Sequence, residues 1–138
     1  MDFPHAVSFL ANTNFAAPFY AIVTGTQRRG AIISIQANTS NTRVEYLNDT
    51  SSVSFKVQTN FNRWVPDSTE GIYPEGRRTM AESTMTMLGR ERSGSELGVW
   101  MALSAYPVLN PSTMFSVLMS VSKEPEIYVR DQIMVPSP

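Results

Sequence analysis

The sequence has 138 residues, a net charge of −1 and no cysteine. This is the length of one domain, and 42% hydrophobic with 17% charged residues is typical of a folded protein that carries little charge. The near-neutral balance excludes a global electrostatic attraction to nucleic acid or to an anionic membrane. The absence of cysteine excludes disulfides and thiolate metal sites, and favours folding in a reducing compartment.

The basic residues are mostly arginine, which suits buried or interfacial pairs with carboxylates better than lysine does. Low overall charge together with this bias favours a protein that works by contacting other chains. The sequence opens without the charged and apolar pattern of a signal peptide. It also lacks an apolar run of about 18 residues, so we expect no membrane span.

Residues 1–29 are expected to form an arm and one short helix. The stretch from Phe3 to Leu10 fits an extended arm or a short strand. A helix begins at Asn14 or Pro18 and ends at Gly25, because asparagine caps helices, proline is tolerated in the first turn, and glycine ends helices.

From Gly30 onward the hydrophobic period becomes two, which predicts strands. Turn signals recur every 8–12 residues in most of the chain, a spacing typical of sandwiches and barrels. The predicted strands are 31–36, 43–47, 52–58, 84–88, 97–103, 114–121 and 126–130, with a charged hairpin tip at 89–94. The predicted core consists of Ile33, Ile35, Val53, Phe55, Val57, Val99, Met101, Phe115, Val117 and Met119.

Residues 59–82 contain two prolines, two glycines and many charges, which predicts a long loop. Loops of this length in compact domains are usually functional or interfacial. Exposed aromatic and arginine side chains are the usual anchors of such contacts. The residues we expect to make interface contacts are Trp64, Ile72, Tyr73, Arg77 and Arg78, together with an extended tail at 131–138.

The sequence offers little catalytic chemistry. His5 is the single histidine, no second histidine can complete a triad, and no nucleophile-elbow motif is present. The carboxylates of the long loop are Asp67, Glu70 and Glu75, and Glu124 and Glu126 form a second group. Their spacing matches no known calcium loop or paired-acid motif, so we predict a non-enzymatic protein without a metal or cofactor.

Three arginine clusters invite comparison with nucleic-acid sites: 28–29, 77–78, and Arg90 with Arg92. Acidic residues lie beside two of them, Glu75 near the second and Glu91 inside the third. Salt bridges with other protein groups are therefore the favoured interpretation, and we do not expect nucleic acid as a direct partner.

Two segments carry a resemblance to a known family. In residues 15–36 an aromatic-rich short helix leads through Arg28-Arg29-Gly30 into an apolar strand, and in residues 96–135 a loop at 106–111 precedes a long strand at 114–122. This arrangement resembles the later part of the jelly-roll capsid proteins of picorna-like viruses. The resemblance implies an all-β, jelly-roll-like antiparallel β-sandwich over residues 1–138, either complete or completed by a partner chain.

The resemblance also implies a function. We expect a structural protein, a subunit or fragment of a non-enveloped virus capsid, located in the virion and assembled in the host cytoplasm. Its partners would be copies of itself or sibling coat proteins, with a host receptor as a further candidate. Two alternatives stay open: a receptor- or glycan-binding β-sandwich head of a viral or phage fibre, and a small β-sandwich hydrolase that uses Glu70 or Glu75.

Overall fold

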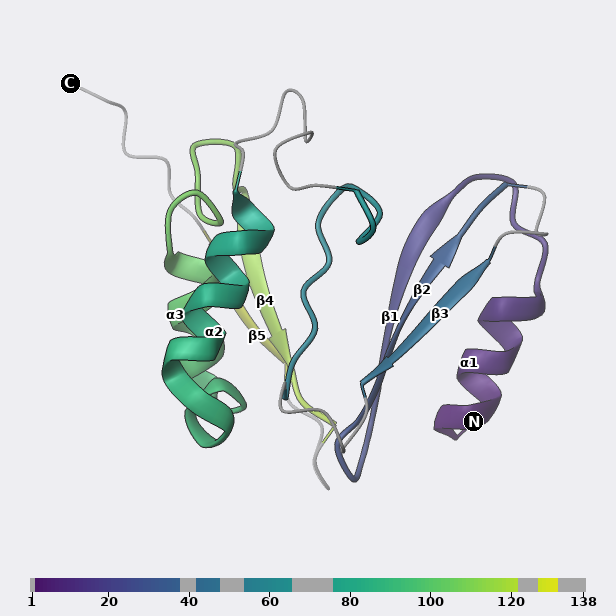
Figure 1. Cartoon of the computed structure of the whole chain (residues 1–138), viewed down its shortest axis with the longest axis horizontal. Helices are drawn as coiled ribbons and strands as arrows, with labels where there is room; N and C mark the ends of the chain where they lie inside the picture. Colours follow the sequence, from purple (N-terminus) through teal and green to yellow (C-terminus); the bar gives the residue numbers. More distant parts are fainter. Residues whose placement is uncertain (1, 38–41, 48–53, 66–75, 122–126, 132–138) are drawn as a thin grey trace. The chain divides into compact units, whose positions relative to one another are not determined.

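The computed structural model describes residues 2–37, 42–47, 54–65, 76–121 and 127–131 (Figure 1). Contacts divide the chain into two compact units, Met1–Gln58 and Thr59–Pro138. The elements follow the order α1 (Phe3–Asn12), β1 (Phe19–Gly25), β2 (Arg29–Ile35), β3 (Arg43–Leu47), α2 (Arg77–Ser93), α3 (Glu96–Ser104), β4 (Phe115–Met119) and β5 (Ile127–Asp131). The single domain predicted for residues 1–138 stays a prediction, since two compact units are compatible with one domain or two.

The first unit contains a three-stranded antiparallel sheet in the order β1-β2-β3. The registers place Phe19 opposite Ile35 and Ile33 opposite Val44. All residues of β2 from Ala31 to Ile35 are buried, so both faces of the central strand are covered. This agrees with the apolar run in the sequence and confirms the strands predicted at 31–36 and 43–47.

Helix α1 packs against β1 and β2, and Val7 joins Ala31, Ile33 and Ile35 in the core of this unit. Residues Phe3, Val7 and Leu10 follow a helical period of three to four, which gives the helix one apolar face. The prediction of an arm or short strand here is wrong. The partly buried residues around this core are Phe3, Leu10, Phe15, Ala21, Val23 and Val44.

The helix predicted to begin at Asn14 or Pro18 is also wrong, because residues 19–25 form strand β1. This stretch is rich in aromatic and β-branched residues, which favour strands. It pairs along its whole length with β2, from Phe19 to Gly25. Tertiary pairing therefore outweighs the capping signals on which the helix prediction rested.

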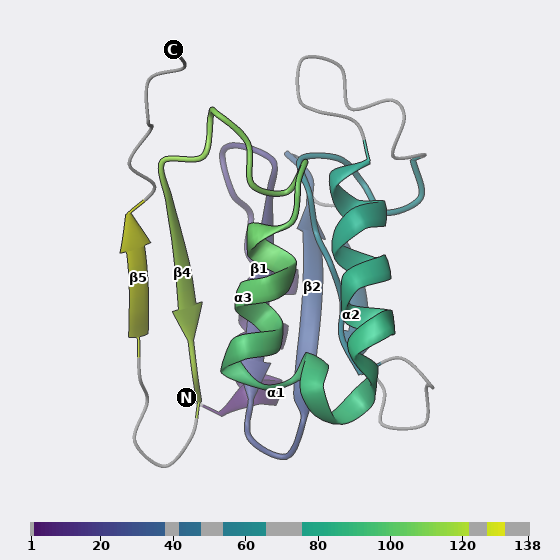
Figure 2. The same cartoon turned by 90° about the vertical axis from the view of Figure 1, so that its left-hand side faces the viewer.

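The second unit contains α2, α3 and the two-stranded antiparallel sheet β4-β5 (Figure 2). Helix α2 packs against α3, and α3 packs against β4. The strands predicted at 114–121 and 126–130 are confirmed as β4 and β5. In the part of the chain that the structure describes, no helix is long and apolar enough to cross a membrane.

The strands predicted at 84–88 and 97–103 are wrong, because both segments are helical. The threonine hydroxyls of the first segment bond within α2: Thr84 Oγ1 donates to Met80 O at 2.9 Å and Thr86 Oγ1 to Glu82 O at 2.7 Å. Helix α3 begins at a serine cap, where Ser95 Oγ accepts from the Gly98 N–H at 3.1 Å. The cap at Ser95 thus favours a helix over the strand that the apolar pattern at 97–103 predicted.

Gly98 fixes how closely the start of α3 approaches the end of α2. A Cβ on this residue would lie 2.0 Å from the carbonyl oxygen of Arg92, which belongs to rigid backbone. Ser93, which follows Arg92 in the sequence, is 1% exposed. Glycine is therefore required for the close corner between the two helices.

The predicted core is confirmed at Ile33 and Ile35 and is wrong at three residues of the second unit. Ile33 and Ile35 are fully buried, whereas Met101, Phe115 and Met119 are 46%, 59% and 68% exposed. The other members that the structure describes, Phe55, Val57, Val99 and Val117, are half-buried, and Val53 lies outside the described residues.

The all-β prediction holds only for the antiparallel pairing of the strands. Helices and sheets are mixed in the described chain, and no jelly-roll sandwich is present among the described residues. In the strand predicted at 52–58, residues 54–58 belong to no strand, and 52–53 are outside the described residues. Helix α2 begins at Arg77, within the predicted loop at 59–82, and the tail at 132–138 is not described.

The β1–β2 hairpin generates a first prediction. Gln27 and Arg28 in its turn have φ of 59° and 57°, and the Arg29 N–H donates to Thr26 O at 3.4 Å. Left-handed backbone costs a non-glycine residue about 1 kcal/mol. We expect Arg28→Gly to raise the free energy of unfolding by about that amount. Urea unfolding measures it, with Thr26→Gly as a control that should not stabilise.

Helix α2 generates a second prediction. Gly89 interrupts it with φ 70° and ψ 174°, a conformation open almost only to glycine, whereas Gly94 has φ −87° and ψ −1°. A Cβ at either residue meets nothing within 4 Å, so only the backbone differs. We expect Gly89→Ala to destabilise by about 1–3 kcal/mol and Gly94→Ala by no more than about 0.5 kcal/mol. Equal urea midpoints for the two variants would contradict the break at Gly89.

Candidate functional site

A pair of side chains at the start of α2 forms the centre of the candidate site. Arg77 Nη2 donates to Asn60 Oδ1 at 2.7 Å, across 17 residues of sequence. Arg77 directly follows Gly76, whose φ of 77° turns the chain into the helix. Asn60 is exposed and Arg77 is half-buried, so a ligand can reach the pair.

The hydrogen bond orients the amide of Asn60. Its oxygen accepts from the guanidinium of Arg77, and its Nδ2 carries two N–H donors. A neighbouring cation also polarises the amide and makes its N–H groups better donors. The pair therefore offers N–H donors to a ligand.

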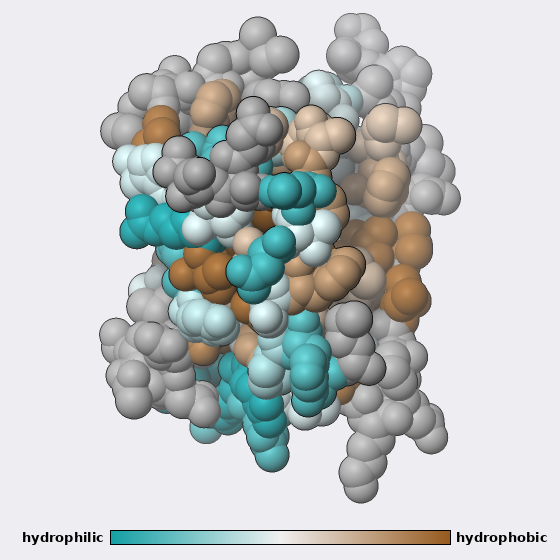
Figure 3. All heavy atoms as spheres, turned by 90° about the vertical axis from the view of Figure 1, so that its right-hand side faces the viewer, coloured by the Kyte–Doolittle hydropathy of each residue, from teal (hydrophilic) through white to brown (hydrophobic). Residues whose placement is uncertain are grey.

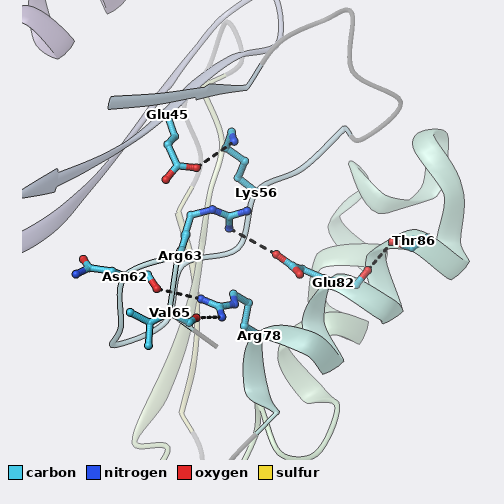
Figure 4. A network of polar contacts seen from close by, with 8 residues as sticks. All are labelled: Glu45, Lys56, Asn62, Arg63, Val65, Arg78, Glu82 and Thr86. Atoms are coloured by element: carbon cyan, nitrogen blue, oxygen red, sulfur yellow. Dashed lines mark hydrogen bonds and ion pairs between the residues drawn. The ribbon is translucent and has the colours of Figure 1, made fainter. Parts of the chain in front are cut away.

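The next residue, Arg78, is only 8% exposed. Its Nη2 donates to the carbonyl oxygen of Val65 at 2.6 Å and its Nη1 to that of Asn62 at 3.4 Å (Figure 4). The Val65 N–H donates to the Asn62 oxygen at 2.9 Å, which closes a turn between these residues. We call residues 60–65 the site segment.

A second contact joins the site segment to α2. Arg63 Nη1 lies 3.5 Å from Glu82 Oε1, one helical turn beyond Arg78 (Figure 4). Figure 4 also includes the ion pair between Lys56 Nζ and Glu45 Oε2 at 3.8 Å, which belongs to the first unit. The site segment is thus fixed to α2 at three points, through Arg77, Arg78 and Arg63.

Chemically, the pair fits an anionic or carbonyl oxygen. A guanidinium and an amide N–H group are the kinds of donor that stabilise negative charge on the oxygen of an acyl group under attack. Neither supplies a metal ligand at its donor side. In the described residues, no group of three His, Cys, Asp or Glu side chains is placed to hold a metal ion.

The residues that the sequence singled out fall in different places. Trp64 is 49% exposed, and Arg77 and Arg78 make the contacts described above. Ile72 and Tyr73 lie outside the described residues. The interface role predicted for all five stays a prediction.

Sequence reasoning missed Asn60. Nothing in its immediate neighbourhood marks it, because its partner lies 17 residues away and belongs to a helix that was predicted as loop. The cluster at 77–78 was recognised, but its charge was assigned to contacts with other chains. The signal that could have found the site is an arginine that is buried and hydrogen-bonds to a polar segment earlier in the same chain.

Of the titratable groups that the sequence raised as catalytic candidates, His5 is described by the structure and lies in α1. His5 donates its backbone N–H to Asp2 Oδ1 at 3.0 Å and places its ring Nδ1 2.7 Å from the same oxygen. These hydrogen bonds lower the pKa of Asp2, so the cap of α1 persists above the usual carboxyl pKa and is lost as the pH falls through the lowered value. The carboxylates Asp67, Glu70, Glu75, Glu124 and Glu126 lie outside the described residues.

The first unit has a groove of about 500 Å³ between α1 and the sheet. It is lined by Phe3, Pro4, Val7, Ser8, Ala11, Asn12, Arg29, Val44 and Tyr46. Figure 3 shows the face of the molecule that includes α1, where hydrophilic and hydrophobic residues lie side by side. The lining includes no acidic residue and no second cation beside Arg29, so the groove contains no set of groups for acid–base chemistry.

Comparison with known proteins identifies relatives of one kind. The chain is 30% identical over 131 residues to the acid ceramidase of Heterocephalus glaber, covering 94% of this chain and 32% of that protein. It is 29% identical to the N-acylethanolamine-hydrolyzing acid amidase of Rattus norvegicus, covering 93% and 34%, and 28% identical to the acid ceramidase of Homo sapiens, covering 94% and 32%. No family model matches the chain. The chain spans about a third of the length of these relatives.

These relatives overturn the functional predictions made from the sequence. The resemblance to picorna-like capsid proteins is wrong, because the match over 94% of the chain is to animal enzymes named as ceramidases and amidases. The predicted roles as a capsid subunit or as a viral binding head, the location in a virion, and the absence of enzymatic function are contradicted by the same finding. The resemblance failed because it rested on strand and turn patterns that many folds share.

The site generates a prediction about Arg63 and Glu82. Their side chains are 20% and 38% exposed at a separation of 3.5 Å, so water screens the pair. We expect a double-mutant cycle with Arg63→Gln and Glu82→Gln to give a coupling energy of about 0.2–1 kcal/mol. Urea unfolding of the four proteins measures it. A coupling of zero would show that the pair does not hold the site segment.

Proposed function

We propose that this chain is part of an amide hydrolase and that Asn60 and Arg77 hold the carbonyl oxygen of the amide that is cleaved. The observation that carries the proposal is the 2.7 Å contact between these side chains, which presents donors at an accessible surface. The names of the relatives supply the reaction class, because an acid amidase that hydrolyses N-acylethanolamines and a ceramidase both cleave N-acyl amides.

The chemistry follows from where charge develops. When a nucleophile attacks an amide carbonyl, negative charge moves onto the oxygen, and the C–N bond breaks as that charge returns. Asn60 Nδ2–H donates to this oxygen, and the cation of Arg77 behind the amide strengthens the donation. One such donor is worth about 10²–10³ in kcat. The proposal assigns no nucleophile to this chain.

The substrate class that fits is an N-acyl amide of an amino alcohol, since ceramides and N-acylethanolamines share this linkage. The donor pair recognises only the carbonyl, so it does not distinguish the two. About two thirds of each relative has no counterpart in this chain. We therefore assign recognition of the carbonyl oxygen, and not of the acyl chain, to these residues.

A chimera tests the proposal. In the acid ceramidase of Heterocephalus glaber, the segment that matches this chain is replaced by this chain, and release of fatty acid from ceramide and from an N-acylethanolamine is measured by mass spectrometry. We expect hydrolysis by the chimera, and a fall in kcat of about 10²-fold in Asn60→Ala. Asn60→Asp, which replaces donors by an acceptor, should lose at least as much.

The control is Asn12→Ala, an exposed asparagine at the end of α1 whose amide donates to Ser8 O at 2.7 Å. It should leave kcat unchanged. Circular dichroism and a thermal melt establish that each chimera is folded. A folded chimera without hydrolysis, or one in which Asn60→Ala retains full kcat, would overturn the proposed role.

A further inference from the structure

We propose that Arg78 is a positioning residue, which closes the turn between Asn62 and Val65 and thereby holds Asn60 against Arg77. The inference rests on the proposed function, because it concerns how the donor pair is kept in place. It goes beyond that function by assigning the geometry of the pair to a residue that does not itself meet a ligand.

The site segment is irregular, since residues 54–65 belong to no described strand or helix. Its turn at residues 62–65 includes the backbone bond from Val65 N–H to Asn62 O at 2.9 Å. Side chains that extend from a rigid element and bind carbonyl groups restrict the motion of an irregular segment. Helix α2 is such an element.

Arg78 supplies the support from a buried position. The residue is 8% exposed, and its guanidinium donates to both ends of the turn, at 2.6 Å to Val65 O and 3.4 Å to Asn62 O. A planar fork of donors can bridge two carbonyl oxygens, whereas a lysine ammonium is a point charge on a flexible stem. Removing the fork would take away both of these charge-assisted hydrogen bonds, which are stronger than bonds between neutral groups.

The order of residues along the helix links this turn to the donor pair. Arg77 and Arg78 are consecutive in α2, so their side chains leave the helix about 100° apart. Arg77 binds the segment at Asn60 and Arg78 binds it two to five residues later. Because both arginines extend from one rigid backbone, the turn and the amide of Asn60 keep a fixed relation to each other.

The test compares Arg78 with Arg92, an exposed arginine in the same helix. The variants are Arg78→Lys and Arg78→Ala, with Arg92→Lys and Arg92→Ala as matched controls. In the purified chain, hydrogen exchange of the Val65 amide and the NMR signals of the Asn60 side-chain amide report the turn and the donor pair. In the chimera, kcat and KM report the reaction.

We expect Arg78→Lys to speed exchange at Val65 at least about tenfold and to shift the Asn60 signals. We expect kcat to fall by about 10–10²-fold with KM changed less than about threefold, because misplaced donors weaken transition-state binding. Guanidinium ion, added far below the concentrations that unfold proteins, should partly restore kcat in Arg78→Ala but not in Asn60→Ala. The Arg92 variants should match the parent in every measurement.

The outcomes separate this inference from the function on which it rests. If Asn60→Ala lowers kcat while a folded Arg78→Lys keeps the parent kcat, positioning by Arg78 is overturned and the donor pair stands. If Arg78→Lys changes exchange at Val65 but not kcat, its role is structural only, which also overturns the inference. If Asn60→Ala retains full kcat, the proposed function itself fails.

Discussion

The two consecutive arginines at the start of α2 determine the architecture of the candidate site. One binds the amide of Asn60 and the other binds both ends of a turn that carries no regular secondary structure. The burial of Arg78 makes this a demanding arrangement, since a guanidinium removed from water is stable only if its donors are used. Side chains of helix α2 thus bind a segment that has no regular secondary structure.

Dependence on contacts with distant residues separates the parts of the fold that sequence reasoning predicts from those it does not. Strands β2, β3, β4 and β5 were predicted because their apolar residues alternate or run continuously, and pairing then followed the pattern. All three helices and β1 were misassigned, because the structure that these segments adopt depends on the residues they contact. The sequence around Val7 fits a strand, but in the structure Val7 lies on a helix that packs against Ile33. The sequence around Thr84 also fits a strand, but its hydroxyl bonds the backbone of a helix.

The candidate site shows the same limit. Arg77 and Arg78 were recognised from their charge, but the sequence does not say whether an arginine will face a partner chain or fold back onto its own. Which of the two occurs depends on the turn at Asn62–Val65. Its acceptors are backbone carbonyl oxygens, which no particular residue type marks in the sequence. Asn60 is conspicuous only once that turn is seen. The residue types therefore predicted which segment carries hydrogen-bond donors, and only the contacts showed which acceptor groups these donors bind.

The boundary between the two units bears on which part of the chain sets the geometry of the site. It falls between Gln58 and Thr59, immediately before the segment that begins at Asn60. The amide of Asn60, both arginines, the turn and the Arg63–Glu82 pair all lie on its C-terminal side. The contacts that position the donor pair are therefore made inside a single compact unit.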